Sequence, residues 1–67
     1  MGEMRALKGA IVEKGQNYQK CAEACGISIQ TFNKKINGRG AFTCWEIKKL
    51  SEFLELPQEE IVRVFLL

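Results

Sequence analysis

The charged side chains of this sequence are distributed unevenly, with most of the positive charge in the middle of the chain. Residues 16–40 hold Lys20, Lys34, Lys35 and Arg39 against one acidic residue, Glu23, which gives a net charge of +3. The preceding segment has a net charge of +1, and the segment that follows has a net charge of −2. A local basic surface is what binding of a polyanion requires. The alternative is a solvated helix face, and charge alone favours neither interpretation.

Few residues have the types and spacing that catalysis or metal binding needs. The sequence has three cysteines, Cys21, Cys25 and Cys44, and no histidine. An odd number of cysteines does not form a closed disulfide framework, and a zinc site would need an uncommon carboxylate ligand. Cys21 and Cys25 suit small apolar core positions. Cys44 lies at a predicted helix start, where a redox role is a minor alternative.

The remaining composition predicts a small protein without enzymatic activity. The sequence shows no phosphate-binding loop, no paired buried carboxylates and no nucleophile–base pair, so we expect no enzyme, no cofactor and no small-molecule ligand. It has no secretory signal and no apolar run of about 18 residues, so we expect a cytoplasmic protein that does not enter a membrane. Its 67 residues are enough for one domain, residues 1–67.

Five segments have apolar residues at helical spacing, and none shows the alternation typical of a strand. They are residues 4–14, 18–25, 29–36, 44–54 and 58–65. Asn17 and Ser28 are placed to cap the second and third segments, and Thr43 with Glu46 fits a capping box at the fourth. An apolar content of 46% is normal for a globular protein. Together with the five helical segments, it predicts a compact all-α domain of five helices.

Two predicted helices in the middle of the chain have the spacing of a helix-turn-helix unit. They are separated by three residues, Gly26, Ile27 and Ser28. Such a unit needs a small residue where the helices cross, a glycine in the turn and an apolar anchor on the second helix. Ala22, Gly26 and Phe32 supply these, and Ile27 fills the crossing. In proteins with this unit, the second helix enters the major groove of DNA.

The sequence YQKCAEACGISIQTF, residues 18–32, resembles the core of Cro/repressor-type helix-turn-helix proteins. The run NKKING at residues 33–38, followed by residues 42–56 and a short acidic helix ending in Val64 and Phe65, resembles a subgroup common in phages of Gram-positive bacteria. The resemblance covers nearly the whole chain. It implies a lambda-repressor-like fold and a transcriptional regulator, repressor or Cro-like, that binds double-stranded DNA.

The sequence departs from the family pattern at a few positions. Tyr18 stands where the family often has glutamine, and Gln19 follows one residue later. Cys21 and Cys25 stand where larger aliphatic residues are usual. Ile29 occupies a position that is often polar, and an apolar residue there suits either a thymine methyl group or packing.

Carried over residue by residue, the resemblance implies that residues 29–36 read DNA. Gln30 would pair with an adenine edge, and Lys34, four residues on, would reach a guanine or a phosphate. The implied base contacts are Ile29, Gln30, Thr31, Asn33 and Lys34. The implied contacts to the DNA backbone, which position the protein without reading sequence, are Asn17, Gln19, Ser28, Lys35, Asn37 and Arg39. The alternative for each is a solvated surface.

The C-terminal segment carries more apolar side chains than a short helix is expected to bury. They are Ile61, Val64, Phe65, Leu66 and Leu67. An apolar surplus predicts a partner surface, here a homodimer interface. A two-fold dimer would place two recognition helices about 34 Å apart, which matches a palindromic site.

A second class of function stays open. A helical protein-interaction module, such as an antitoxin-like regulator that binds a partner protein, would share this fold without needing to bind DNA. The basic middle of the chain and the polar residues in segment 29–36 argue against it.

Overall fold

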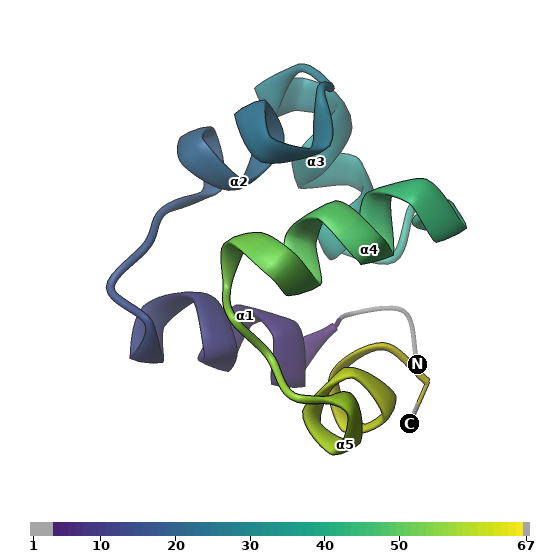
Figure 1. The fold of residues 1–67 in the computed structure, drawn as a ribbon. Coiled ribbons are helices and arrows are strands. Elements are labelled where there is room, and N and C mark those ends of the chain that lie inside the picture. Colours follow the sequence, from purple (N-terminus) through teal and green to yellow (C-terminus); the bar gives the residue numbers. More distant parts are fainter. Residues whose placement is uncertain (1–3, 67) are drawn as a thin grey trace.

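The structure, a computed structural model, describes residues 4–66, and every regular element in this range is helical (Figure 1). The elements are α1 (Arg5–Glu13), α2 (Tyr18–Cys25), α3 (Ile29–Ile36), α4 (Cys44–Phe53), α5 (Gln58–Ile61) and a π-helical segment η1 (Val62–Leu66). The predicted all-α class is confirmed, and α2 and α3 have the predicted bounds. The helix predicted over residues 58–65 is instead a short α-helix that continues as a π-helix.

The core collects the apolar face of each longer helix. Leu7 and Ile11 of α1, Phe32 and Ile36 of α3 and Leu50 of α4 are all within 1% of full burial. The other buried apolar residues are Ala10, Cys21, Ala22, Cys25, Leu54, Leu56 and Val64. The two cysteines of α2 are therefore core residues, as their spacing predicts. Burial of these faces supplies the main free energy that holds such a small domain together.

A row of four aromatic rings connects α2 to the C-terminal segment. The ring centroids are 5.5 Å apart for Tyr18 and Phe32, 5.6 Å for Phe32 and Phe42, and 6.0 Å for Phe42 and Phe65. The last two pairs meet edge to face, which the charge distribution of aromatic rings favours. Because Phe32 contacts the rings on both sides, it holds α3 against α2 and against the loop before α4.

The helices form two groups on either side of α4, and these groups meet where the Met4 N–H donates to the Ile36 carbonyl at 3.2 Å. In Figure 1, α2 and α3 form one end, α4 crosses the middle, and α1 lies with α5 and η1 at the other end. α2 packs against both α3 and α4, and η1 packs against α1. Within residues 4–66, none of the helices combines the length and the apolar composition needed to cross a membrane.

Two exposed glycines should respond in opposite directions to replacement by alanine. Gly9 lies within α1, and a Cβ there would meet no atom within 4 Å. Gly9→Ala should therefore raise the free energy of unfolding by about 0.5–1 kcal/mol, because glycine is a poor helix former. Gly26 has a φ of +75°, a left-handed conformation that is unfavourable for alanine. Gly26→Ala should therefore lower the free energy of unfolding by about 1–2 kcal/mol. Urea titrations of dilute protein measure both changes, and effects of equal sign would contradict these backbone conformations.

Candidate nucleic-acid interface

The connection from α2 to α3 is fixed by its backbone. Gly26 ends α2 in the left-handed conformation, with a φ of 75°, and its N–H donates to the Glu23 carbonyl at 3.1 Å. The N–H of Ile27 donates to the Ala22 carbonyl at 3.1 Å, and the Ile27 side chain packs against the core. These contacts close α2 and redirect the chain into α3 within three residues.

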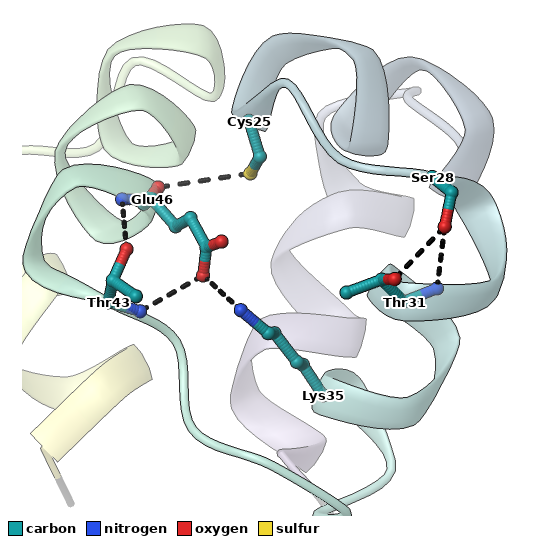
Figure 2. Close-up of polar contacts among 6 residues, drawn as sticks. All are labelled: Cys25, Ser28, Thr31, Lys35, Thr43 and Glu46. Atoms are coloured by element: carbon teal, nitrogen blue, oxygen red, sulfur yellow. Dashed lines mark hydrogen bonds and ion pairs between the residues drawn. The ribbon is translucent and has the colours of Figure 1, made fainter.

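Side chains cap the starts of both helices, as the sequence predicts. Asn17 Oδ1 accepts a hydrogen bond from the Lys20 N–H at 2.8 Å, and Ser28 Oγ accepts one from the Thr31 N–H at 3.1 Å. The Ser28 hydroxyl also donates to the Thr31 hydroxyl at 3.0 Å (Figure 2). Asn17 and Ser28 are both exposed, so the two helix starts, where free N–H groups favour anions, are open to solvent.

The outer face of α3 is polar and has no partner in the described part of the chain. Gln30, Asn33 and Lys34 are exposed, on the side of the helix away from the buried Phe32 and Ile36. No other described residue forms a hydrogen bond or ion pair with the three exposed side chains. Their amide and ammonium groups are therefore available for an external ligand.

The turn after α3 adds an exposed arginine to this face. Its backbone is set by Gly38 and Gly40, with φ values of 85° and 154°, and the Arg39 N–H donates to the Lys34 carbonyl at 2.8 Å. The Arg39 guanidinium has no hydrogen-bond partner among the described residues. We term Gln30, Asn33, Lys34 and Arg39 the α3 surface. It carries two cations and no acidic residue.

Two other residues predicted to contact bases lie at the edge of the α3 surface. Thr31 is half-buried, and its hydroxyl accepts the hydrogen bond from Ser28. Ile29 is half-buried and packs against the core. Part of the Ile29 side chain is therefore used for packing against the core, which is one of the two roles that the sequence left open.

Lys35, a predicted contact to the DNA backbone, is not part of the α3 surface, because its ammonium is paired within the protein. Its side chain is 17% exposed, and its Nζ lies 2.7 Å from Glu46 Oε1 on α4 (Figure 2). The same ammonium lies 6.0 Å from the centroid of the Phe42 ring. Withdrawing Lys35 from this site would leave the Glu46 carboxylate largely buried without a counter-charge, which is costly. The positive charge of Lys35 therefore serves the fold.

Glu46 joins three helices at one point (Figure 2). Its Oε1 accepts hydrogen bonds from Lys35 Nζ at 2.7 Å and from the Thr43 N–H at 3.0 Å, while its own N–H donates to Thr43 Oγ1 at 3.1 Å. The two bonds with Thr43 are the predicted capping box of α4. The Cys25 thiol of α2 donates to the Glu46 carbonyl at 3.9 Å. Glu46 thus fixes the position of α3 relative to α2 and α4.

The ionisation states around Glu46 follow from burial and hydrogen bonding. Burial raises the pKa of the Glu46 carboxyl, but hydrogen bonds from Lys35 and Thr43 outweigh this and hold the pKa below its usual value. Burial, with a smaller contribution from a neighbouring acidic group, raises the pKa of Cys21 and of Cys25 to about 11. Both thiols are therefore protonated at neutral pH, and they serve as core side chains.

Asn37 and Gln19 have partners within the protein. Asn37 Nδ2 donates to the Asn33 carbonyl at 2.9 Å, and Asn37 Oδ1 accepts from Lys8 Nζ at 2.9 Å. Asn37 therefore ties the end of α3 to α1, and its phosphate contact stays a prediction because the residue is exposed. Gln19 Nε2 donates to Glu23 Oε2 at 3.2 Å on the exposed side of α2. A single exposed hydrogen bond exchanges with water, so Gln19 stays a candidate for a phosphate contact.

The C-terminal residues of the predicted dimer interface differ in burial. Val64 is only 4% exposed and belongs to the core. Ile61 and Phe65 are half-buried and pack against the core. Leu67 and the side chain of Leu66 lie outside the described residues. The large apolar side chains that are exposed are Val12, Trp45 and Val62.

The fold and the site define a small all-helical domain with an exposed, polar and basic helix face. The family model described as "Protein of unknown function (DUF739)" matches residues 2–67. The chain therefore belongs to this family. No curated protein and no solved structure matches the sequence.

The Lys35–Glu46 pair should make stability depend on pH. Because the folded-state pKa of Glu46 is lowered, its contribution is fully present above the pKa of the unfolded chain and is lost as the pH falls through the folded pKa. Glu46→Gln should lower the free energy of unfolding by about 1–3 kcal/mol at pH 7, because it removes the charge from a nearly buried pair. At acidic pH the difference from the wild type should shrink.

Urea titrations at several pH values measure this difference. The matched control is Glu52→Gln, an exposed glutamate on the same helix, which should change stability by less than about 0.5 kcal/mol. A Glu46→Gln difference that stays constant from pH 7 to acidic pH would contradict the assigned role of the ion pair.

Proposed function

We propose that this protein is a sequence-specific DNA-binding transcriptional regulator that reads the major groove with α3. The proposal depends on one observation, which is that the α3 surface presents amides and cations without partners in the described chain. The lengths of α2 and α3 and the three-residue turn between them support the proposal, because a helix-turn-helix unit joins two helices by such a turn and places the second in the major groove.

The side chains of the α3 surface suit base edges. Gln30 and Lys34 are four residues apart, so they lie one turn apart on the same side of α3. A glutamine amide pairs in bidentate fashion with adenine, and a lysine ammonium donates to the acceptors of guanine. Asn33, three residues after Gln30, adds a second amide beside them. We infer that these three side chains read the sequence.

Other exposed groups suit the phosphates on either side. The starts of α2 and α3 offer N–H groups and the exposed caps Asn17 and Ser28, and Gln19 lies in the first turn of α2. Arg39 extends the positive charge beyond the end of α3. Such contacts set the register of a protein on DNA without reading its sequence. The Glu46 contacts hold α3 in a fixed position, which precise readout needs.

The resemblance of residues 18–38 to Cro/repressor-type proteins supports a phage or prophage repressor or Cro-like regulator. In this proposal the protein is a single domain without enzymatic activity or cofactor. It acts in the cytoplasm on double-stranded DNA, and a homodimer would bind a palindromic site.

A second candidate is a helical module that binds another protein, as an antitoxin-like regulator does. It is favoured by an apolar groove between α4 and the C-terminal segment, lined in part by Ile47, Leu56, Ile61 and Phe65. Such grooves accept apolar faces of partner helices. The two candidates differ in the surface that they use, so variants of α3 separate them.

Selection from a random DNA library, followed by binding measurements on the enriched site, tests the proposal. Gln30→Ala should weaken binding to the enriched site by about 1–3 kcal/mol and relax the preference at one base pair. Gln58→Ala, the same change at an exposed glutamine of α5, should leave affinity and preference unchanged. Absence of any enriched sequence would contradict the proposal and favour the protein-binding candidate.

A salt series separates phosphate contacts from base contacts. Lys34→Ala should reduce the slope of log K against log salt by about 1 if the ammonium reaches a phosphate, and should leave the slope unchanged if it reaches a guanine. Lys48→Ala on the exposed side of α4 should change neither affinity nor slope. Equal effects of the two lysine variants would show that binding is a diffuse charge effect and not a property of the α3 surface.

A further inference from the structure

The outward side of α1 has a symmetric pattern of side chains about Gly9. Leu7, Ala10 and Ile11 are buried on the inward side of α1. The residues within about 60° of Gly9 on the opposite side, at 100° per residue, are Arg5, Ala6, Val12 and Glu13. We term Arg5, Ala6, Gly9, Val12 and Glu13 the Gly9 face.

Most of the Gly9 face is exposed, and only Ala6 of its five residues packs against the core. Val12 is 77% exposed, more than any other large apolar residue that the structure describes. Gly9 is exposed, and a Cβ there would meet nothing within 4 Å, so no contact inside the protein requires a glycine. Glycine inside a helix is unfavourable. A common reason for it is close approach of another backbone, and within this molecule none approaches.

The charges on the Gly9 face are arranged to complement a second copy of themselves. Arg5 lies four residues before Gly9, and Glu13 lies four residues after it, about 6 Å away along the helix in each direction. Ala6 and Val12 are likewise three residues before and after Gly9. A two-fold axis that passes between the two Gly9 residues, perpendicular to both helices, relates α1 to an antiparallel partner helix. Each Arg5 then lies at the level of the partner's Glu13, and each Val12 at the level of the partner's Ala6.

We propose that two copies of this chain associate through the Gly9 face, with α1 packed antiparallel on α1 of the partner. The glycines at the crossing point allow the two backbones to approach closely. The pairing covers Val12 and forms two symmetric ion pairs, the arrangement that an isologous two-fold interface requires. This inference does not depend on DNA binding, and it places the dimer contact on α1 instead of on the C-terminal residues.

Neighbouring charges leave Arg5 and Glu13 available for this pairing. Arg63 of η1 lines the same side of α1, but its guanidinium is bonded to Glu60 at 2.5 Å. Glu13 makes only a weaker electrostatic contribution to Arg63. Arg5 has no hydrogen bond or ion pair with another described residue. The Gly9 face and the α3 surface share no residue, so the pairing does not use the α3 surface.

The contact area is that of a weak dimer. A single face of a nine-residue helix buries less than the roughly 800 Å² per partner of a standard stable interface. The ion pairs lie at the rim, where salt screens them. The dimer should therefore form at high protein concentration and dissociate as the ionic strength rises.

Analytical ultracentrifugation of the full chain with charge-reversed variants tests the proposal. Arg5→Glu and Glu13→Arg should each weaken dimerisation at least tenfold, because each places like charges opposite one another. The double variant, with both changes, restores opposite charges and should recover the wild-type dimerisation constant to within about threefold. Lys48→Glu, a charge reversal on α4, is the matched control and should have no effect.

Gly9→Ala distinguishes an interface glycine from a merely local one. It should weaken dimerisation at least tenfold while it raises the Tm of the monomer, because the added methyl group separates the helices but favours each of them. The proposal is overturned if the wild-type chain is monomeric at high concentration. The proposal is also overturned if the chain dimerises and the Arg5, Gly9 and Glu13 variants leave the dimerisation constant unchanged. That result would favour an interface formed by the C-terminal residues.

Discussion

The ion pair between Lys35 and Glu46 is the interaction on which the proposed reading surface depends. α3 has only eight residues, and apolar packing at Phe32 and Ile36 holds its inner side without fixing its rotation. The 2.7 Å contact from Lys35 to a carboxylate that also caps α4 supplies a directional constraint. It sets the orientation of α3 relative to α4, and with it the direction in which Gln30 and Lys34 face.

This constraint divides the basic segment into two parts with different roles. Lys35 is paired with Glu46, so its charge does not add to the outward charge of α3, and the neutral Asn37 ties α3 to α1. What remains outward is the α3 surface, a small set of amides and cations at one end of the molecule. The Gly9 face, on the outward side of α1, shares no residue with the α3 surface. We infer a protein with separate surfaces for DNA and for a second copy, built on one small core.

Local sequence signals predicted the elements of this fold well. Asn17, Ser28 and the Thr43–Glu46 box marked the helix starts, and Gly26 marked the turn, because caps and left-handed residues act within a few positions of the chain. The Lys35–Glu46 pair could not be predicted in this way, since it joins two helices whose relative orientation only the packed core defines. The same limit applies to the burial of Val64, which depends on how η1 packs against α1.

The most direct test of the central claim is a titration of isotope-labelled protein with its selected DNA site, followed by the NMR shifts of backbone and side-chain amides. We predict saturable changes at the side-chain amides of Gln30 and Asn33 and at the backbone of α3 and of the first turn of α2. The amides that line the groove between α4 and the C-terminal segment should stay unperturbed. Changes confined to the groove between α4 and the C-terminal segment, or an absence of saturable changes, would contradict the account.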